Sequence, residues 1–218
     1  PDVLLMDEPF GAIDPITRDR LQNEFLRLQA DLQKTIVFVT HDIDEAVKMG
    51  DRIAILRDQS EIAQIDVPEE ILTHPADSFV ENFLGSGAIL KTLTLRRLND
   101  IELSHPLEIA RSTNRTEALA QLQESHFPYA VLLDDSRQPI AWVDERALNR
   151  SESLDSAASR ITVKLQPEDT LQDALSSMLQ SSAGMSAVVD SRGNYLGTCT
   201  IDSLASMLVD RTDSGARS

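Results

Sequence analysis

Two carboxylates and a histidine stand directly after two short apolar segments near the start of the chain. Asp7 and Glu8 follow residues 3–6, and His41 follows residues 36–39 with one threonine between. A carboxylate at a strand end can hold Mg²⁺, and a second one can orient or deprotonate an attacking water. An imidazole can donate a hydrogen bond to a phosphate oxygen and stabilise its developing charge. These residue types therefore suit Mg²⁺-assisted chemistry on a phosphate.

The elements around these residues explain how they could meet. Both apolar segments are typical of buried parallel strands, and a 3.6-residue apolar period over residues 21–32 predicts a helix between them. The carboxyl ends of parallel strands lie at one edge of a sheet, where α/β proteins place their ligands. We therefore expect Asp7, Glu8 and His41 to be neighbours, although they lie 33 or 34 positions apart.

The composition indicates an acidic globular protein from a reducing compartment. Its 218 residues carry 20 Lys+Arg against 36 Asp+Glu, and the net charge of −16 disfavours binding to nucleic acid. The single cysteine, Cys199, excludes a disulfide framework and a multi-cysteine metal site. No apolar run is long enough to span a bilayer. Because Pro1 directly precedes a strand pattern, we expect the chain to be the back part of a longer protein.

The second half of the chain repeats itself at an offset of 56 residues. Residues 107–109 align with 163–165, and residues 131–134 align with 187–190, without a gap. Each copy has the pattern of a strand, a helix, an apolar strand, a polar turn, a second strand and a helix. Two copies predict a tandem pair with a shared buried face, because a solenoid needs at least three.

A glycine-rich break at residues 85–87 separates the repeats from the N-terminal part. We expect an α/β domain over residues 1–87, one repeat over 88–150 and the other over 151–212. Residues 213–218 are polar and predict a disordered tail.

Three N-terminal motifs together resemble those of ABC-type ATPases. Residues 3–9, Val-Leu-Leu-Met-Asp-Glu-Pro, resemble the Walker B element, residues 11–14 resemble the D-loop, and residues 40–42 resemble the H-loop. The resemblance implies the C-terminal part of a P-loop ABC ATPase domain, with a parallel βαβ sheet and with ATP and Mg²⁺ as cofactors.

The same resemblance assigns a role to each candidate site residue. Asp7 would bind Mg²⁺ and its nucleotide, Glu8 would be the catalytic base, and His41 would be the catalytic histidine that contacts the γ-phosphate. Asp14 would contact the facing subunit, and through it the nucleotide, across a nucleotide-sandwich dimer.

Two motifs of ABC ATPases are absent from the sequence. None of the eight glycines is followed by lysine, so the phosphate-binding Walker A loop is missing, and so is the Leu-Ser-Gly-Gly-Gln signature. Since backbone amides and that lysine hold the phosphates, we expect the chain alone not to hydrolyse ATP.

The repeated half resembles a tandem pair of CBS domains, an α+β fold, most clearly at residues 186–197. Such pairs commonly bind adenine nucleotides in their cleft, with a Thr/Ser and an Asp three positions later on the ribose. Here Thr200 is followed by Ser203, and the first copy, residues 144–147, has neither group. The missing carboxylate removes a charge-assisted contact and places nucleotide binding at Thr200 in doubt. Dimerisation, ionic-strength sensing and cyclic di-AMP binding at a dimer interface are the alternatives.

An ATPase part followed by two CBS domains resembles the ATP-binding subunits of importers for glycine betaine, proline, choline or carnitine. This arrangement implies a second copy of the chain, a membrane permease and, indirectly, a substrate-binding protein as partners. It also implies a peripheral location on the cytoplasmic face of the plasma (inner) membrane, and no nucleic-acid partner. The alternatives are a non-enzymatic CBS regulator that keeps an ABC remnant for docking, and an ABC protein of another importer family.

Overall fold

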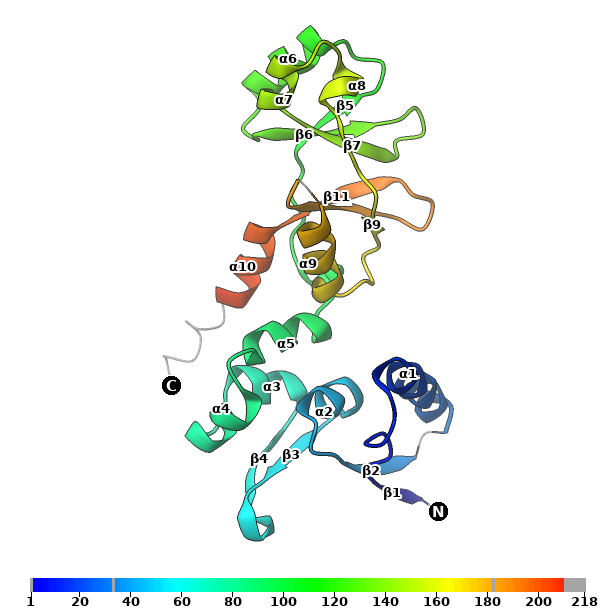
Figure 1. Cartoon of the computed structure of the whole chain (residues 1–218), viewed down its shortest axis with the longest axis vertical. Helices are drawn as coiled ribbons and strands as arrows, with labels where there is room; N and C mark the ends of the chain where they lie inside the picture. Colours follow the sequence, from blue (N-terminus) through cyan, green and yellow to red (C-terminus); the bar gives the residue numbers. More distant parts are fainter. Residues whose placement is uncertain (1, 33, 182, 210–218) are drawn as a thin grey trace. The chain divides into compact units, whose positions relative to one another are not determined.

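The computed structural model describes residues 2–32, 34–181 and 183–209, which form two compact units, Pro1–Leu95 and Arg96–Ser218 (Figure 1). The first unit contains ten elements within its described residues. They are β1 (Val3–Asp7), α1 (Pro15–Leu32), β2 (Thr35–Val39), α2 (Ile43–Met49), β3 (Ile53–Leu56), a 3₁₀ turn (Asp58–Ser60), β4 (Ile62–Asp66), α3 (Pro68–Thr73), α4 (Ser78–Leu84) and α5 (Ala88–Leu95).

Strands β1 and β2 pair in parallel, which confirms the predicted βαβ unit. Val3 lies opposite Thr35 and Asp7 lies opposite Val39, so both strands end at the same edge of the sheet. One face is covered where Phe10 contacts the rings of Phe25, on α1, and Phe38, on β2.

The other face of this two-stranded sheet is exposed, so the expectation that both strands are fully buried is wrong. Val3 is 54% exposed, Leu5 74%, and Val37 and Val39 nearly half. The physical reason is that a two-stranded sheet has two faces, and within the described residues α1 and Phe10 cover only one. The apolar pattern of the strands predicts a cover for both.

A second core forms around the antiparallel β3–β4 hairpin. Proline at the first position of α3 and Asp77 at the N-cap of α4 begin the two helices that pack against the hairpin. The fully or almost fully buried side chains of this core are Val47, Ile53, Ile55, Ile71, Leu72, Val80 and Leu84.

The second unit confirms the repeat at the predicted offset. Its elements are a 3₁₀ turn (Leu98–Asp100), β5 (Leu107–Ala110), α6 (Arg115–Glu124), β6 (Tyr129–Leu133), β7 (Pro139–Asp144), α7 (Glu145–Arg150), α8 (Leu154–Ala157), β8 (Ser159–Arg160), β9 (Lys164–Leu165), α9 (Leu171–Gln180), β10 (Met185–Val189), β11 (Tyr195–Thr200) and α10 (Ile201–Val209). The bounds of α6, β6 and β7 shifted by 56 residues are those of α9, β10 and β11.

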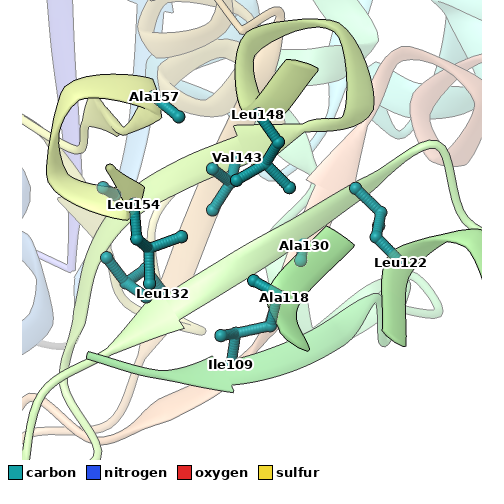
Figure 2. Packing of buried hydrophobic residues seen from close by; sticks show 10 residues of the cluster. Ile109, Ala118, Leu122, Ala130, Leu132, Val143, Leu148, Leu154 and Ala157 are labelled. Atoms are coloured by element: carbon teal, nitrogen blue, oxygen red, sulfur yellow. The ribbon is translucent and has the colours of Figure 1, made fainter. Parts of the chain in front are cut away.

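Both repeats have the same topology and the same kind of core. The first strand of each copy pairs in parallel with the second, and the second pairs antiparallel with the third. Figure 2 shows the first copy, where Ile109, Leu122 and Leu148 meet between the sheet and its helices. Leu148 is fully buried, and its counterpart Leu204 is 4% exposed.

The segment before each repeat joins the sheet of the other repeat. Strand β8, which precedes the second copy, pairs with β7 of the first, and Ser104, which precedes the first copy, bridges to Thr198 in β11. A shared core of Val131, Leu133, Trp142, Ala187 and Tyr195 draws side chains from both copies. The two repeats are therefore built as one folding unit.

The expected domain limits at 87/88 and 150/151 stay predictions, and the expected tail lies outside the described residues. Among the described helices, none is long and apolar enough to cross a membrane.

Candidate functional site

The structure brings Glu8 and His41 together at the carboxyl edge of the β1–β2 sheet. The Glu8 N–H donates to the Val39 carbonyl at 2.9 Å, which continues the sheet one residue beyond β1. Glu8 Oε1 accepts the His41 backbone N–H at 2.9 Å and lies 2.6 Å from His41 Nδ1. Asp7 is the last residue of β1, beside this pair in the chain.

A tight turn after β1 holds the Glu8 carboxylate. The backbone of Glu8 has φ 46°, a left-handed conformation that residues other than glycine seldom adopt. The Gly11 N–H donates to the Glu8 carbonyl at 3.2 Å. A Cβ at Gly11 would lie 3.3 Å from Glu8 Oε2, so glycine leaves room for this oxygen. Glu8 Oε2 is itself buried and has no hydrogen-bond partner among the described residues. Strain and an unpartnered buried oxygen are both typical of functional sites.

The charge of Glu8 acts on the histidine. The hydrogen bond to Glu8 and its negative charge raise the pKa of His41 above 6.5, and Asp42 and Glu45 add smaller effects of the same sign. The imidazole is 81% exposed, so the ring is accessible to an incoming anion.

Asp14 immediately precedes α1 and makes no hydrogen bond or ion pair with Glu8 or His41 in the described part of the chain. It accepts a hydrogen bond from the Thr17 N–H at 3.1 Å, and hydrogen bonds from Thr17 lower the pKa of this exposed carboxyl. The Asp7 carboxylate has no hydrogen-bond or ion-pair partner among the described residues, and it is exposed.

Sequence reasoning gave no structural role to Glu45, which fixes the segment after His41. Glu45 is 5% exposed, and its carboxylate accepts hydrogen bonds from Thr40 Oγ1 at 2.9 Å and Gln22 Nε2 at 3.2 Å. Thr40 Oγ1 in turn accepts the Asp42 N–H at 3.0 Å. The only sequence signal for this network is a carboxylate at a position where α2 turns towards the core.

A second candidate site is a cleft in the repeat pair. The cavity has a volume of about 1130 Å³, and Thr200 lies in its lining. Thr200 Oγ1 accepts the Ser203 N–H and lies 3.1 Å from Ser203 Oγ, at the start of α10. In the first copy, Asp144 caps α7 in the same way and accepts the Ala147 N–H at 2.7 Å.

The described residues contain no cluster of three or more His, Cys, Asp or Glu side chains that could hold a metal by themselves. Mg²⁺, however, is commonly held by one or two carboxylates together with substrate phosphates and water. An exposed, unpartnered carboxylate such as Asp7 is a hard oxygen donor of this kind.

Comparison with known proteins gives the same kind of protein repeatedly, although no family model matches the chain. The osmoprotectant import ATP-binding protein OsmV of Salmonella typhimurium is 39% identical over 212 residues, which are 95% of this chain and 55% of the relative. The choline transport ATP-binding protein OpuBA of Bacillus subtilis is 35% identical over 216 residues, 96% of this chain and 56% of the relative.

Solved structures with a similar fold include OpuCA of Staphylococcus aureus, with a TM-score of 0.44 and 17% identity, over 50% of this chain and 97% of that one. The CBS-pair protein CBSX2 of Arabidopsis thaliana has a TM-score of 0.48 and 16% identity, over 54% of this chain and 97% of that one. The mixed α/β architecture with two repeats of 56-residue offset agrees with the expected fold class.

The chain spans about half the length of the curated relatives that it matches. Over nearly all of its own length it aligns with proteins of one kind, at identities of about a third or more. By sequence, the chain is therefore similar over nearly all of its length to the ATP-binding subunits of osmoprotectant, choline and carnitine import systems.

Proposed function

We propose that residues 1–95 supply the catalytic carboxylate and histidine of an ATP-binding import subunit, and that the repeat pair regulates transport. The observation that carries this proposal is the contact of Glu8 Oε1 with His41 Nδ1, 2.6 Å apart at the end of two parallel strands. Glu8 and His41, 33 positions apart in the chain, therefore meet at the carboxyl edge of the sheet, where βαβ units bind their ligands.

The geometry supports separate roles for the two residues. Glu8 keeps one carboxylate oxygen, Oε2, without a partner in the described residues, and the carboxylate would accept a proton from an attacking water. His41, with its raised pKa, is the donor to a γ-phosphate oxygen. Asp7 would hold Mg²⁺, which neutralises phosphate charge when it is bound with ATP.

Features of the first unit indicate that other parts of an ATPase domain complete it. In addition to the exposed face of β1 and β2, a cavity of about 790 Å³ is lined by β2 and β3, and Thr40 and His41 belong to its lining. Since the sequence has no Walker A loop or signature, we propose that the chain alone does not hydrolyse ATP. The completed subunit would pair with a second copy near Asp14 and act peripherally on a membrane permease, with a substrate-binding protein as an indirect partner.

Transport is tested by a chimera. The aligned part of Salmonella OsmV is replaced by this chain in cells that depend on OsmV, and uptake of an osmoprotectant is measured at high salt. We expect uptake in the chimera and its loss in the Glu8→Gln chimera. The Glu24→Gln chimera is the matched control, because Glu24 is exposed on α1 and, among the described residues, pairs only with Arg27.

Uptake that is equal in the two variants would refute the role of Glu8. Equal protein levels of both chimeras, checked by immunoblot, separate loss of chemistry from loss of folding. The alternative of a CBS regulator with an ABC remnant predicts that both variants behave alike. Adenine nucleotide at Thr200 and cyclic di-AMP at a dimer interface stay predictions for the repeat pair.

A further inference from the structure

The cleft of the repeat pair is a cavity of about 1130 Å³ that the proposed ATPase chemistry does not use. Its walls come from the segment before the first repeat, from the entry into β6, from the entry into β10, and from the start of α10. The lining therefore belongs to both repeats, and its volume is that of a site for a small molecule.

The charged groups in this lining are mostly acidic. Asp100, Glu102 and Asp202 line the cavity, against Arg96 and the titratable ring of His105. Arg96 already has an interaction of its own. A phosphate in this cleft would meet more acidic than basic side chains, and like charges repel each other. The lining therefore disfavours an anion and favours a cation.

Two aromatic rings line the same cleft as these carboxylates. Phe127 and Tyr129 both line the cleft, with ring centroids 6.2 Å apart and planes at 61°. The charge of Asp202 acts on Tyr129, whose pKa is raised first by burial and then by this carboxylate. Aromatic rings and a carboxylate in one cleft are the groups that bind compact organic cations, for which cation–π attraction adds to the ion pair.

The group that a nucleotide would need is missing at the same place. Ser203 stands where a ribose-binding carboxylate is expected, and its side chain lies 3.1 Å from Thr200 Oγ1. Met185 and Met207 add polarizable apolar surface to the lining instead. Methyl groups around a positive nitrogen suit such a surface better than a sugar with its hydroxyl groups does.

We propose that this cleft binds a compact organic cation of the quaternary ammonium class, held by Asp202 and by the rings of Phe127 and Tyr129. The proposal concerns the second unit alone and does not depend on the ATPase chemistry of the first. It is an alternative to an adenine nucleotide at Thr200, and the two ligands have opposite charge.

Isothermal titration calorimetry of the full 218-residue chain tests the charge selectivity. The probes are choline, its neutral isostere with carbon in place of the quaternary nitrogen, and AMP. We expect choline to bind and the isostere to bind roughly fivefold to thirtyfold more weakly, the loss of one desolvated cation–π and ion-pair contact. We expect no heat from AMP at the same concentrations.

Variants assign the contacts. Asp202→Asn should weaken choline binding at least about fivefold, while Asp135→Asn, in the exposed turn between β6 and β7, should leave it unchanged. Tyr129→Phe keeps a ring and should bind choline, whereas Tyr129→Leu should not. The only tryptophan, Trp142, meets Tyr129 edge-on at 6.1 Å, so its fluorescence reports both folding and occupancy.

Three outcomes would overturn the proposal: AMP binding more tightly than choline, equal binding of choline and its neutral isostere, or no binding of choline at millimolar concentration. Equal effects of Asp202→Asn and Asp135→Asn would also overturn the placement of the site. Both aspartates are exposed, so neither variant should prevent folding.

Discussion

Gly197→Ala tests whether the two repeats fold as one unit. A Cβ at residue 197 would lie 2.8 Å from Leu103 Cβ and 3.3 Å from His105 Cε1. The intervening Ser104 exchanges two backbone hydrogen bonds with Thr198, both 2.8 Å long. The added methyl group therefore pushes against the backbone segment that ties the first repeat to the sheet of the second.

The expected cost follows from the distance. Leu103 must retreat by about 0.6 Å to reach ordinary contact at 3.4 Å. Overpacking of this kind costs about 1–3 kcal/mol, and loss of the two hydrogen bonds would add up to about 2 kcal/mol. We expect the free energy of unfolding to fall by about 1–3 kcal/mol if the segment shifts and keeps its hydrogen bonds, and by more if it detaches.

The assay is urea unfolding followed by the fluorescence of Trp142 and by circular dichroism. Trp142 lies in β7 of the first repeat, and it packs in the core that Ala187 and Tyr195 of the second repeat share. A substitution in β11 should therefore shift the midpoint that this distant tryptophan reports. The control is Ala141→Gly at the equivalent position of β7, which should cost only about 0.5–1 kcal/mol.

Two results would refute this reasoning. One is a change in the Gly197→Ala variant below about 0.5 kcal/mol, which would show that Leu103 does not depend on this close approach. The other is an unchanged midpoint of Trp142 fluorescence in the Gly197→Ala variant when the circular dichroism transition shifts, because a tryptophan of the first repeat would then not respond to the second.

Three further predictions concern single positions. Leu148→Ala should lower the free energy of unfolding by about 2–5 kcal/mol in urea, because the side chain is fully buried. The control, Leu179→Ala, should change it by less than about 0.5 kcal/mol, because Leu179 is 78% exposed. Similar costs of the two substitutions would contradict the packing in Figure 2. Glu8→Gln should lower the pKa of His41 towards 6.5 in an NMR titration, and an unchanged pKa would contradict their contact. Because the pKa of His41 is raised in the folded chain, the Glu8–His41 pair stabilises the fold fully below pH 6.5, and this contribution is lost as pH rises through the folded-state pKa. A contribution that grew with pH would contradict the raised pKa of His41. Glu45→Ala should cost about 1–3 kcal/mol by leaving buried donors unpaired, and equal stability of variant and wild type in urea unfolding would show that the network is not required.

The proximity of Glu8 and His41 could be predicted from the sequence because strand ends in a βαβ unit are fixed by chain geometry. Parallel pairing places both residues at one edge whatever their separation along the chain. The repeat was equally accessible, since a constant offset of 56 residues needs only the apolar pattern, and β10 and β11 have the bounds that it predicts.

Other features depend on contacts that the local pattern does not encode. The exposure of Leu5 could not be predicted, because an apolar strand has the same sequence whether or not a neighbour covers it. The network around Glu45 and the acidic cleft with Asp202 and Tyr129 join segments far apart in the chain. The partners of Glu45 and the charge balance of the cleft depend on the fold that places those segments together.

The most direct test of the central claim is ATP turnover by the purified chimera with OsmV. The account predicts that Glu8→Gln leaves ATP binding intact and lowers the hydrolysis rate by about 10²–10⁴, the usual contribution of a positioned general base. The Glu24→Gln control should hydrolyse ATP at the rate of the parent chimera. Hydrolysis by the Glu8→Gln chimera within a few-fold of the control would contradict the assignment of Glu8 as the base.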